Sequence, residues 1–140
     1  MGEIGEIQLE HVWKIRQNSL WPDRPLDFVK IDQDAEAWHI GILYNEQWIS
    51  CLSVFFEGAG LAQFRKFGTL VAFQGQGFGS QLITYMFESL KSKGIHSVYC
   101  SARVEKTAFY ERFGMQKAGS PYEKNQKQYI RMELTFTNEP

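Results

Sequence analysis

Two stretches of the chain place apolar side chains at helical spacing. Residues 9–20 carry them on one face, which predicts an amphipathic helix that ends before Pro22. A longer helix is predicted to begin at Phe78, with lysines in its last turn and Gly94 beyond its end. The apolar stripe of this second helix consists of Phe78, Leu82, Ile83, Met86, Phe87 and Leu90.

The segment between the two helices has the β-branched and aromatic residues that are typical of strands. Residues 38–44 and 47–56 predict a hairpin around the polar pair Asn45-Glu46. A glycine-rich turn then leads into a third strand over residues 61–71, with an irregularity near Gly68. We therefore expect three antiparallel strands before the long helix.

The chain after the long helix is predicted to hold a strand, a short helix and a closing strand. These elements cover residues 97–101, 105–113 and 128–136, and the short helix stops at Gly114. The expected order is therefore helix, three strands, helix, strand, helix, strand. Since 140 residues are typical of one domain and no repeat or linker is present, residues 1–140 are expected to form a single domain.

Composition and charge exclude several classes of protein. Hydrophobic residues make up 44% and charged residues 22% of the chain, a balance that excludes a disordered protein. The 15 basic and 16 acidic residues give a net charge of −1, which offers no overall attraction for nucleic acid or anionic membranes. The most apolar stretch, residues 48–56, is too short to span a bilayer. We therefore expect neither nucleic acid nor a membrane among the partners.

Cys51 and Cys100 stand apart, each in a predicted strand, without a CxxC motif or a Cys/His cluster. This pattern favours buried free thiols in a reducing compartment and indicates no metal site. The N-terminus has acidic residues where a signal peptide needs basic ones. These observations together predict a cytoplasmic protein without a metal.

The most informative segment is residues 74–80, Gln-Gly-Gln-Gly-Phe-Gly-Ser, between the third strand and the long helix. Its glycines remove side chains that would keep a ligand away from the backbone, and the helix start supplies unpaired N–H groups. This combination suits a phosphate or pyrophosphate, and a tight turn without a ligand is the alternative. A Walker A loop would need a lysine here, and a dinucleotide site would need an acidic residue after residues 98–101, so both are disfavoured.

Two motifs carry a resemblance to a known family. Gln74-x-x-Gly77-x-Gly79 resembles the acetyl-CoA signature of the GNAT-superfamily N-acetyltransferases, and residues 108–115 are similar to that family's FYxxxGF element. The resemblance covers about residues 38–134. It implies an α/β (α+β) fold with a mixed, mostly antiparallel central sheet flanked by helices. In such a fold the sheet is splayed between the third strand and the strand ending at Ser101, where CoA enters.

The resemblance also implies which residues bind acetyl-CoA, the expected cosubstrate. The backbone of the third strand's end would pair with the pantetheine arm, and the amides of the glycine turn would hold the pyrophosphate. Arg103 stands where the family often has Asn, so it would contact a CoA phosphate or an acidic substrate, or else face solvent. The expected contacts are Thr69, Leu70 and Val71 for the arm, and Gln74, Gly75, Gln76, Gly77, Phe78, Gly79 and Ser80 for the pyrophosphate.

Tyr110 corresponds to the family tyrosine beside the CoA sulfur. A thiol leaves with a pKa of about 8.5 and a tyrosine has about 10, so full proton transfer would be uphill by about 2 kcal/mol. Tyr110 is therefore expected to stabilise the thiolate by a hydrogen bond or to act as general acid, and packing at the helix centre is the alternative. The general base is open, because no carboxylate lies on the third strand before Gly68. Glu57, His39 and Glu123 are weak candidates beside water.

The acceptor pocket is expected beside the N-terminal helix and its following loop, where Arg16, Trp21 and Arg24 could bind a carboxylate or an aromatic group. The alternative is that Trp21 packs and both arginines face water. The expected reaction is direct attack of a small-molecule primary amine on acetyl-CoA. A protein acceptor, another acyl chain, or a non-catalytic acyl-CoA sensor are the alternatives. The resemblance also implies a homodimer, formed through the final strand.

Overall fold

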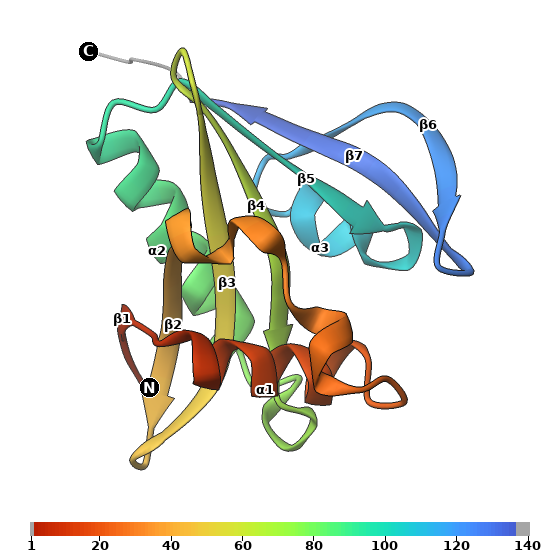
Figure 1. Ribbon diagram of the computed structural model, residues 1–140. Helices are drawn as coiled ribbons and strands as arrows, with labels where there is room; N and C mark the ends of the chain where they lie inside the picture. The colour runs from red at the N-terminus through yellow and green to blue at the C-terminus, as the bar shows by residue number, and fades with distance from the viewer. Residues whose placement is uncertain (1, 137–140) are drawn as a thin grey trace. The chain divides into compact units, whose positions relative to one another are not determined.

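The computed structural model describes residues 2–136 and shows a mixed α/β fold (Figure 1). The described strands are hydrogen-bonded in the order β1-β2-β3-β4-β5-β7-β6. The expected fold class, with a mixed and mostly antiparallel sheet, is confirmed. The strands are β1 (Glu3–Glu6), β2 (Trp38–Tyr44), β3 (Gln47–Gly58), β4 (Leu61–Thr69), β5 (Ser97–Arg103), β6 (Gln116–Lys124) and β7 (Lys127–Thr135). The helices are α1 (Leu9–Leu20), α2 (Phe78–Ser92) and α3 (Thr107–Glu111), with 3₁₀ turns η1 (Leu26–Val29), η2 (Asp32–Glu36), η3 (Val71–Phe73) and η4 (Val104–Lys106).

The chain divides into two compact units. Unit 1 contains the described residues up to Phe55 together with Phe64–Ser89, and therefore holds α1 and most of α2. Unit 2 contains Phe56–Gln63 and the described residues from Leu90 onward.

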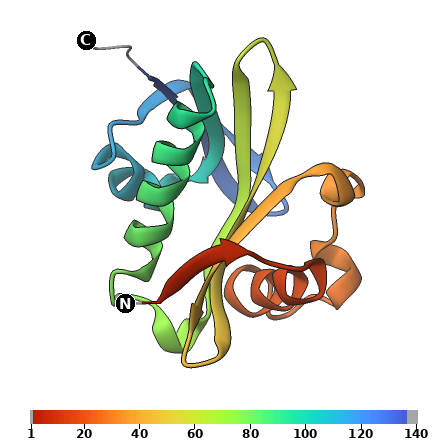
Figure 2. The same ribbon diagram turned by 90° about the vertical axis from the view of Figure 1, so that its left-hand side faces the viewer.

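In unit 1 the two helices lie on opposite faces of the strands (Figure 2). Val12 and Ile15 of α1 pack with Cys51 of β3 in a fully apolar cluster. On the other face Phe87 of α2 meets Phe64 of β4 edge to face, with ring centroids 6.3 Å apart. Burying one face of each amphipathic helix is what stabilises it, because isolated helices of this length are marginal in water.

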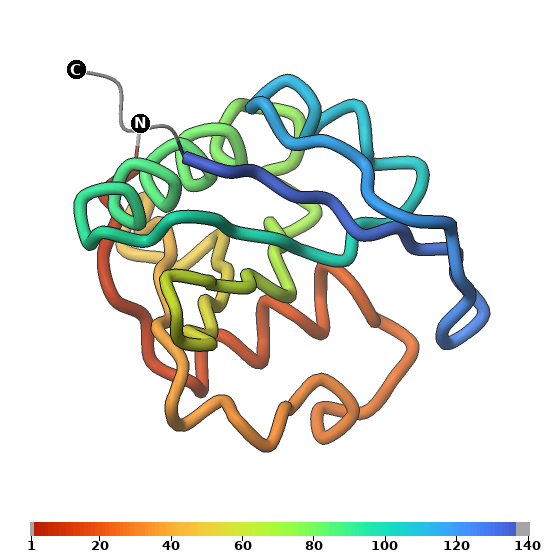
Figure 3. Tube along the Cα trace, turned by 90° about the horizontal axis from the view of Figure 1, so that it is seen from above, coloured from red at the N-terminus to blue at the C-terminus, as the bar shows by residue number. Residues whose placement is uncertain are grey.

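Unit 2 is a small sheet with α3 following β5. β4 and β5 run parallel and pair from Leu61↔Ser97 to Gln63↔Tyr99. β5 pairs antiparallel with β7 along its whole length, from Ser97↔Thr135 to Arg103↔Tyr129, and Figure 3 shows the two strands running side by side. Because β7 also pairs with β6, both of its edges are occupied within unit 2. The expected splay of the sheet, which concerns the two units together, stays a prediction.

The predictions for both long helices are confirmed at 9–20 and 78–92, as is the first hairpin, whose Asn45 and Glu46 both have positive φ. Some bounds were wrong. β4 ends at Thr69, because the next residues form a 3₁₀ turn. The irregularity expected near Gly68 lies two positions earlier, at Lys66 (φ +57°). The short helix covers only Thr107–Glu111, because a 3₁₀ turn occupies its expected start.

The predicted order of elements was also wrong, because it lacked β1 and β6. β6 is exposed along most of its length and carries almost no apolar residues, so it has no hydrophobic face to detect. Gly119 in its middle has φ +77°, and the pairing with β7 is irregular between Ala118 and Tyr122. Such interruptions are typical of edge strands.

Cys51 and Cys100 are free and buried, as predicted. Burial raises the pKa of each thiol to about 12, so both stay protonated and unreactive at neutral pH. Among residues 2–136, no helix is both long enough and apolar enough to cross a membrane.

Candidate active site

The glycine turn lies in unit 1 between η3 and α2, and residues 74–77 are all exposed. Gly75 and Gly77 have φ values of +75° and +91°, which L side chains rarely adopt. The first intrahelical bond is donated by Gln81 to the carbonyl of Gly77 over 3.1 Å. The N–H groups at the very start of α2 therefore have no partner within the helix and are available to an anion.

Gly79 is required for a different reason, because α2 approaches β4 closely at this point. A Cβ on Gly79 would lie 2.8 Å from Cζ of Phe67. Three packed rings fix the base of the turn. The ring centre of Phe78 lies 5.1 Å from that of Tyr44 and 6.2 Å from that of Phe73. The turn is thus mounted on a packed aromatic cluster while its backbone faces solvent.

Two glutamine side chains hold the turn in shape. Gln74 Nε2 donates to the carbonyl of Thr69 over 2.9 Å, and Gln76 Nε2 donates to the carbonyl of Ala72 over 3.2 Å. Both amide groups therefore bond backward to the η3 region. Because both side-chain amides are engaged in this way, the phosphate contacts expected of the turn would come from its backbone N–H groups.

The backbone at the end of β4 is partly engaged already. The N–H of Leu70 donates to the carbonyl of Ile49 over 2.8 Å, and that of Val71 donates to Oδ1 of Asn18 over 3.1 Å. Successive N–H groups of an extended strand point to opposite edges, so the amide of Thr69 points away from β3. Pairing of residues 69–71 with a pantetheine arm stays a prediction, and an arm that bonded to the Val71 N–H would have to displace Asn18.

Tyr110 lies in unit 2, on α3, and is 9% exposed. Burial, with a smaller contribution from the nearby Cys100, raises the pKa of its phenol well above the ordinary value near 10. The hydroxyl therefore remains protonated at any working pH. A neutral phenol can donate a hydrogen bond to a developing thiolate, which is the role expected for Tyr110.

The other candidates of unit 2 lie at its surface or edge. Glu57 accepts a hydrogen bond from the hydroxyl of Tyr99 over 2.5 Å. Arg103 is half-buried at the end of β5, and Glu123 is exposed near the β6–β7 turn. Each thus remains a candidate for the role expected of it.

Arg16 and His39 belong to a buried polar network in unit 1. Arg16 is fully buried, and its guanidinium donates to both carboxylate oxygens of Asp34 over 2.8 and 2.9 Å. His39 Nε2 donates to the carbonyl of Asp34, which can only accept, over 2.7 Å, and Nδ1 lies 2.7 Å from Oγ of Ser53. Arg16 also donates to Ser53 over 3.0 Å. Both residues are therefore held by core partners, a setting the sequence did not indicate because Asp34 lies in the unpredicted turn η2.

Trp21 and Arg24 form a cluster with a residue that the sequence did not single out, Phe28. Trp21 is buried and meets Phe28 edge to face, with centroids 5.1 Å apart. The guanidinium of Arg24 lies 4.6 Å from the ring centre of Phe28 and 5.7 Å from that of Trp21. The structure therefore brings Trp21 and Arg24 together, with Arg16 in the separate ion pair.

The described part of the chain holds no group of three or more His, Cys, Asp or Glu side chains placed to bind a metal. Its residues offer an exposed glycine turn at the start of α2 in unit 1 and a buried neutral phenol in unit 2.

Comparison with known proteins identifies the family. Residues 32–136 match the family model of the acetyltransferase (GNAT) domain. No curated protein sequence matches the chain.

Solved structures share the fold at low sequence identity. The ribosomal-protein-S18-alanine N-acetyltransferase from Escherichia coli has a TM-score of 0.80 at 15% identity, over 100% of this chain and 97% of that chain. An aminoglycoside 6'-N-acetyltransferase complexed with coenzyme A has 0.79 at 13%, over 99% of each chain. A GNAT family acetyltransferase from Elizabethkingia anophelis with acetyl-CoA bound has 0.76 at 14%, over 96% of this chain and 97% of that chain.

Proposed function

The chain belongs to the GNAT acetyltransferase family, and from this premise we propose that it transfers an acetyl group from acetyl-CoA to the primary amine of a small molecule. The amine attacks the thioester carbonyl directly, so that a C–N bond forms while the C–S bond breaks. The amine proton passes to water or to a base, and the leaving thiolate is stabilised by a hydrogen bond. We further propose that these steps take place in a ternary complex, in the cytoplasm.

The observation that supports this proposal best is the exposed glycine turn at the start of α2. Two glycines with positive φ present backbone N–H groups, and the helix start adds its partial positive charge. A diphosphate carries the negative charge that such a site prefers. We propose that the amides of residues 74–80 hold the pyrophosphate of acetyl-CoA and that residues 69–71 pair with its pantetheine arm.

We assign Tyr110 the stabilisation of the thiolate, because its buried phenol stays neutral and can donate. The base is proposed to be water or one of the exposed carboxylates Glu57 and Glu123, because both ring nitrogens of His39 are occupied in the core. The pKa of the acceptor amine determines how much a general base is needed to deprotonate it. A lysine-type amine with a pKa of about 10.4 requires about 4.6 kcal/mol to be neutral at pH 7, and an α-amine requires about 1.

Substitution of Gly77 tests the cosubstrate site. Gly77→Glu places a carboxylate in the turn, and we expect acetyl-CoA affinity measured by calorimetry to fall at least about tenfold through charge repulsion. Gly77→Ala shares the backbone strain at φ +91° but lacks the charge, so it should weaken binding less. Equal affinities for the parent and Gly77→Glu would remove the proposed site.

Release of the thiol over a panel of amines tests the reaction itself. Amine-stimulated release identifies an acetyltransferase acting on small molecules, and stimulation by peptides alone would move the acceptor to a protein. Tight binding of acetyl-CoA with no stimulated release by any acceptor would instead favour an acyl-CoA sensor.

A further inference from the structure

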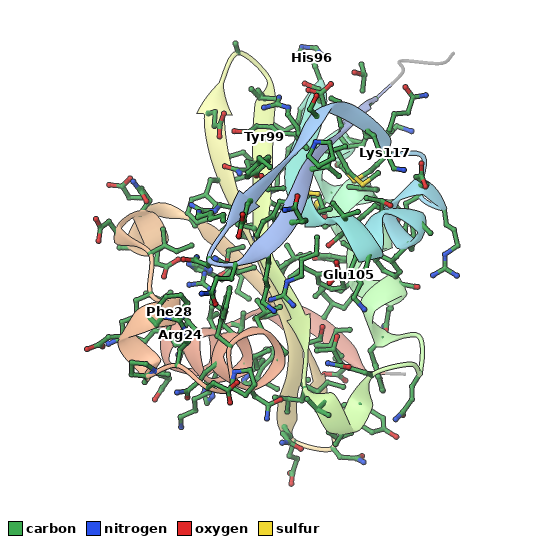
Figure 4. All side chains as sticks on the ribbon, turned by 90° about the vertical axis from the view of Figure 1, so that its right-hand side faces the viewer. Arg24, Phe28, His96, Tyr99, Glu105 and Lys117 are labelled. Atoms are coloured by element: carbon green, nitrogen blue, oxygen red, sulfur yellow. The ribbon has the colours of Figure 1, made fainter. Side chains whose placement is uncertain are left out.

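Arg24 forms an ordered cationic platform with two aromatic rings on the segment after α1. Figure 4 shows Arg24 and Phe28 side by side. The guanidinium lies 4.6 Å from the centre of the Phe28 ring, which itself meets Trp21 edge to face. Arg24 is exposed, whereas Trp21 is buried, so the platform has a fixed base and a charged outer surface.

The backbone beneath the platform is fixed on both sides. Gln17 Nε2 donates to the carbonyl of Arg24 over 2.8 Å, and the N–H of Arg24 donates to the carbonyl of Trp21 over 3.1 Å. Beyond Phe28, the buried guanidinium of Arg16 donates to the carbonyl of Val29 over 2.8 Å. Little conformational freedom therefore remains to be lost when a ligand binds, which favours affinity.

The chemistry of a stacked guanidinium selects the ligand. Aromatic rings contact its face, while its N–H donors point outward in its plane, in the fork that matches a carboxylate. Among residues 2–136 Arg24 has no ion pair, and Asp27, the acidic side chain of the adjoining turn, is paired with Lys30 over 2.9 Å. Within the described residues the charge of Arg24 is therefore available to an anionic ligand.

The platform is tied to the strand end that we propose to pair with the cosubstrate. The last turn of α1 contacts the end of β4, because Asn18 accepts the Val71 N–H and Ser19 touches Gly68. Arg24 follows the end of α1 by four residues and belongs to the same unit. Building on the proposed function, we infer that the acceptor amine carries a carboxylate and that Arg24, stacked on Phe28 and Trp21, binds it.

Matched pairs of acceptors test this inference. Each pair is a carboxylate and its amide, namely 4-(aminomethyl)benzoate with 4-(aminomethyl)benzamide, β-alanine with β-alaninamide, and phenylalanine with phenylalaninamide. For the preferred pair we expect kcat/KM of the acid to exceed that of the amide at least about tenfold, as is typical of a hydrogen-bonded ion pair. Arg24→Gln should bring this ratio close to one, and Arg24→Lys should give an intermediate ratio.

Arg112→Gln is the matched control, because Arg112 is also exposed and lies 5.4 Å from the ring centre of Phe109, in unit 2. It should leave the acid-to-amide ratio of the parent unchanged. The inference is overturned if Arg24→Gln leaves the acid-to-amide ratio unaltered, or if this ratio is already near one in the parent. In either case, acetylation of the amides would still support the proposed function.

Calorimetry separates the remaining outcomes. If acetyl-CoA itself does not bind, the proposed function fails first. If it binds but none of the six amines is acetylated, the acids and amides are titrated into the protein saturated with CoA. Preferential binding of an acid that disappears in Arg24→Gln supports the inference, and equal binding of acid and amide contradicts it.

Discussion

At the scale of single residues, the buried pair of Arg16 and Asp34 joins α1 to the turn η2. Burial alone would raise the pKa of Asp34, but hydrogen bonds from Arg16, Trp13 and the N–H of Ile31, together with the charge of Arg16, bring it below the ordinary value. A buried charge that loses its partner is strongly destabilising, whereas an exposed pair contributes little. This pair therefore holds the segment that carries the Arg24 platform.

Asp34→Asn should lower the free energy of unfolding by about 3–5 kcal/mol, because Arg16 would remain buried without a counter-charge. Asp32→Asn, an exposed change in the same turn, should alter it by less than about 0.5 kcal/mol. Urea denaturation measures both. A loss of similar size in the two variants would contradict the role given to the ion pair.

The same carboxylate predicts how stability depends on pH. A folded-state pKa below the unfolded value near 3.9 gives a stabilisation that is present above that value and is lost as the pH falls through the folded pKa. Acidification from about pH 5 to pH 2 should therefore destabilise the parent more than Asp34→Asn. Denaturation curves recorded across this range check the prediction, and identical pH dependence in both proteins would refute it.

Tyr110→Phe should lower kcat by about 100-fold with little change in the affinity for acetyl-CoA, because the variant retains the packing and loses the donor. Tyr85→Phe makes the same change at an exposed position of α2 and should leave kcat unaltered. An unaltered kcat in Tyr110→Phe would mean that the ring only packs. Because burial raises the pKa of Tyr110, any basic limb of the pH–rate profile below pH 10 must come from another group.

Sequence reasoning could propose single residues where a local motif marked them. Tyr110 was proposed from a motif on its own helix, and the glycines from their spacing. Arg16 was expected near the acceptor from its place on the N-terminal helix. Its buried ion pair was not predicted, because its partner Asp34 lies 18 positions away in a turn with no hydrophobic pattern. Phe28 was not predicted as a site residue, because its contact with Arg24 is formed only in the folded chain.

At the scale of elements, the glycine turn depends on the close approach of α2 to β4. Gly79→Ala would place a Cβ 2.8 Å from Phe67, and overpacking of this kind typically costs about 1–3 kcal/mol. Adding Phe67→Leu should recover part of the loss, because the shorter side chain makes room. Thermal denaturation of the two single variants and the double variant measures the coupling, and strictly additive losses would contradict the contact.

Elements with a hydrophobic face were predictable from sequence and those without one were not. The apolar stripes fixed α1 and α2 in advance, because each helix buries one face on the strands. β6 was not predicted because its side chains are mostly polar and exposed, and β1 was not predicted because it has only four residues. Bounds shifted where 3₁₀ turns replaced the expected strand end at Val71 and helix start at Glu105.

At the scale of the whole molecule, binding of acetyl-CoA should stabilise the fold. At a free concentration 100 times Kd the gain is about 2.7 kcal/mol, which for a chain of this length raises Tm by about 10 °C. Scanning calorimetry with and without acetyl-CoA measures the shift, and the tenfold weaker binding expected for Gly77→Glu should reduce it to about half at the same concentration. The absence of any shift at saturating acetyl-CoA would contradict the proposed cosubstrate. The single domain expected over residues 1–140 stays a prediction, and one cooperative unfolding transition would support it.

Assembly of the molecule also stays a prediction. The expected homodimer through the final strand cannot form by simple strand addition in unit 2, because β7 already has β5 on one side and β6 on the other. A dimer that uses β7 would have to contact its side chains instead.

The polar character of β6 has a consequence for behaviour in a crowded solution. Proline and a left-handed glycine among lysines make a poor template for the backbone of a neighbouring molecule, and the opposite end of the strand order is closed by a strand of only four residues. Neither edge strand therefore favours amyloid-like pairing with another molecule. We therefore expect β6, the strand that the hydrophobic pattern did not predict, to protect the chain against aggregation.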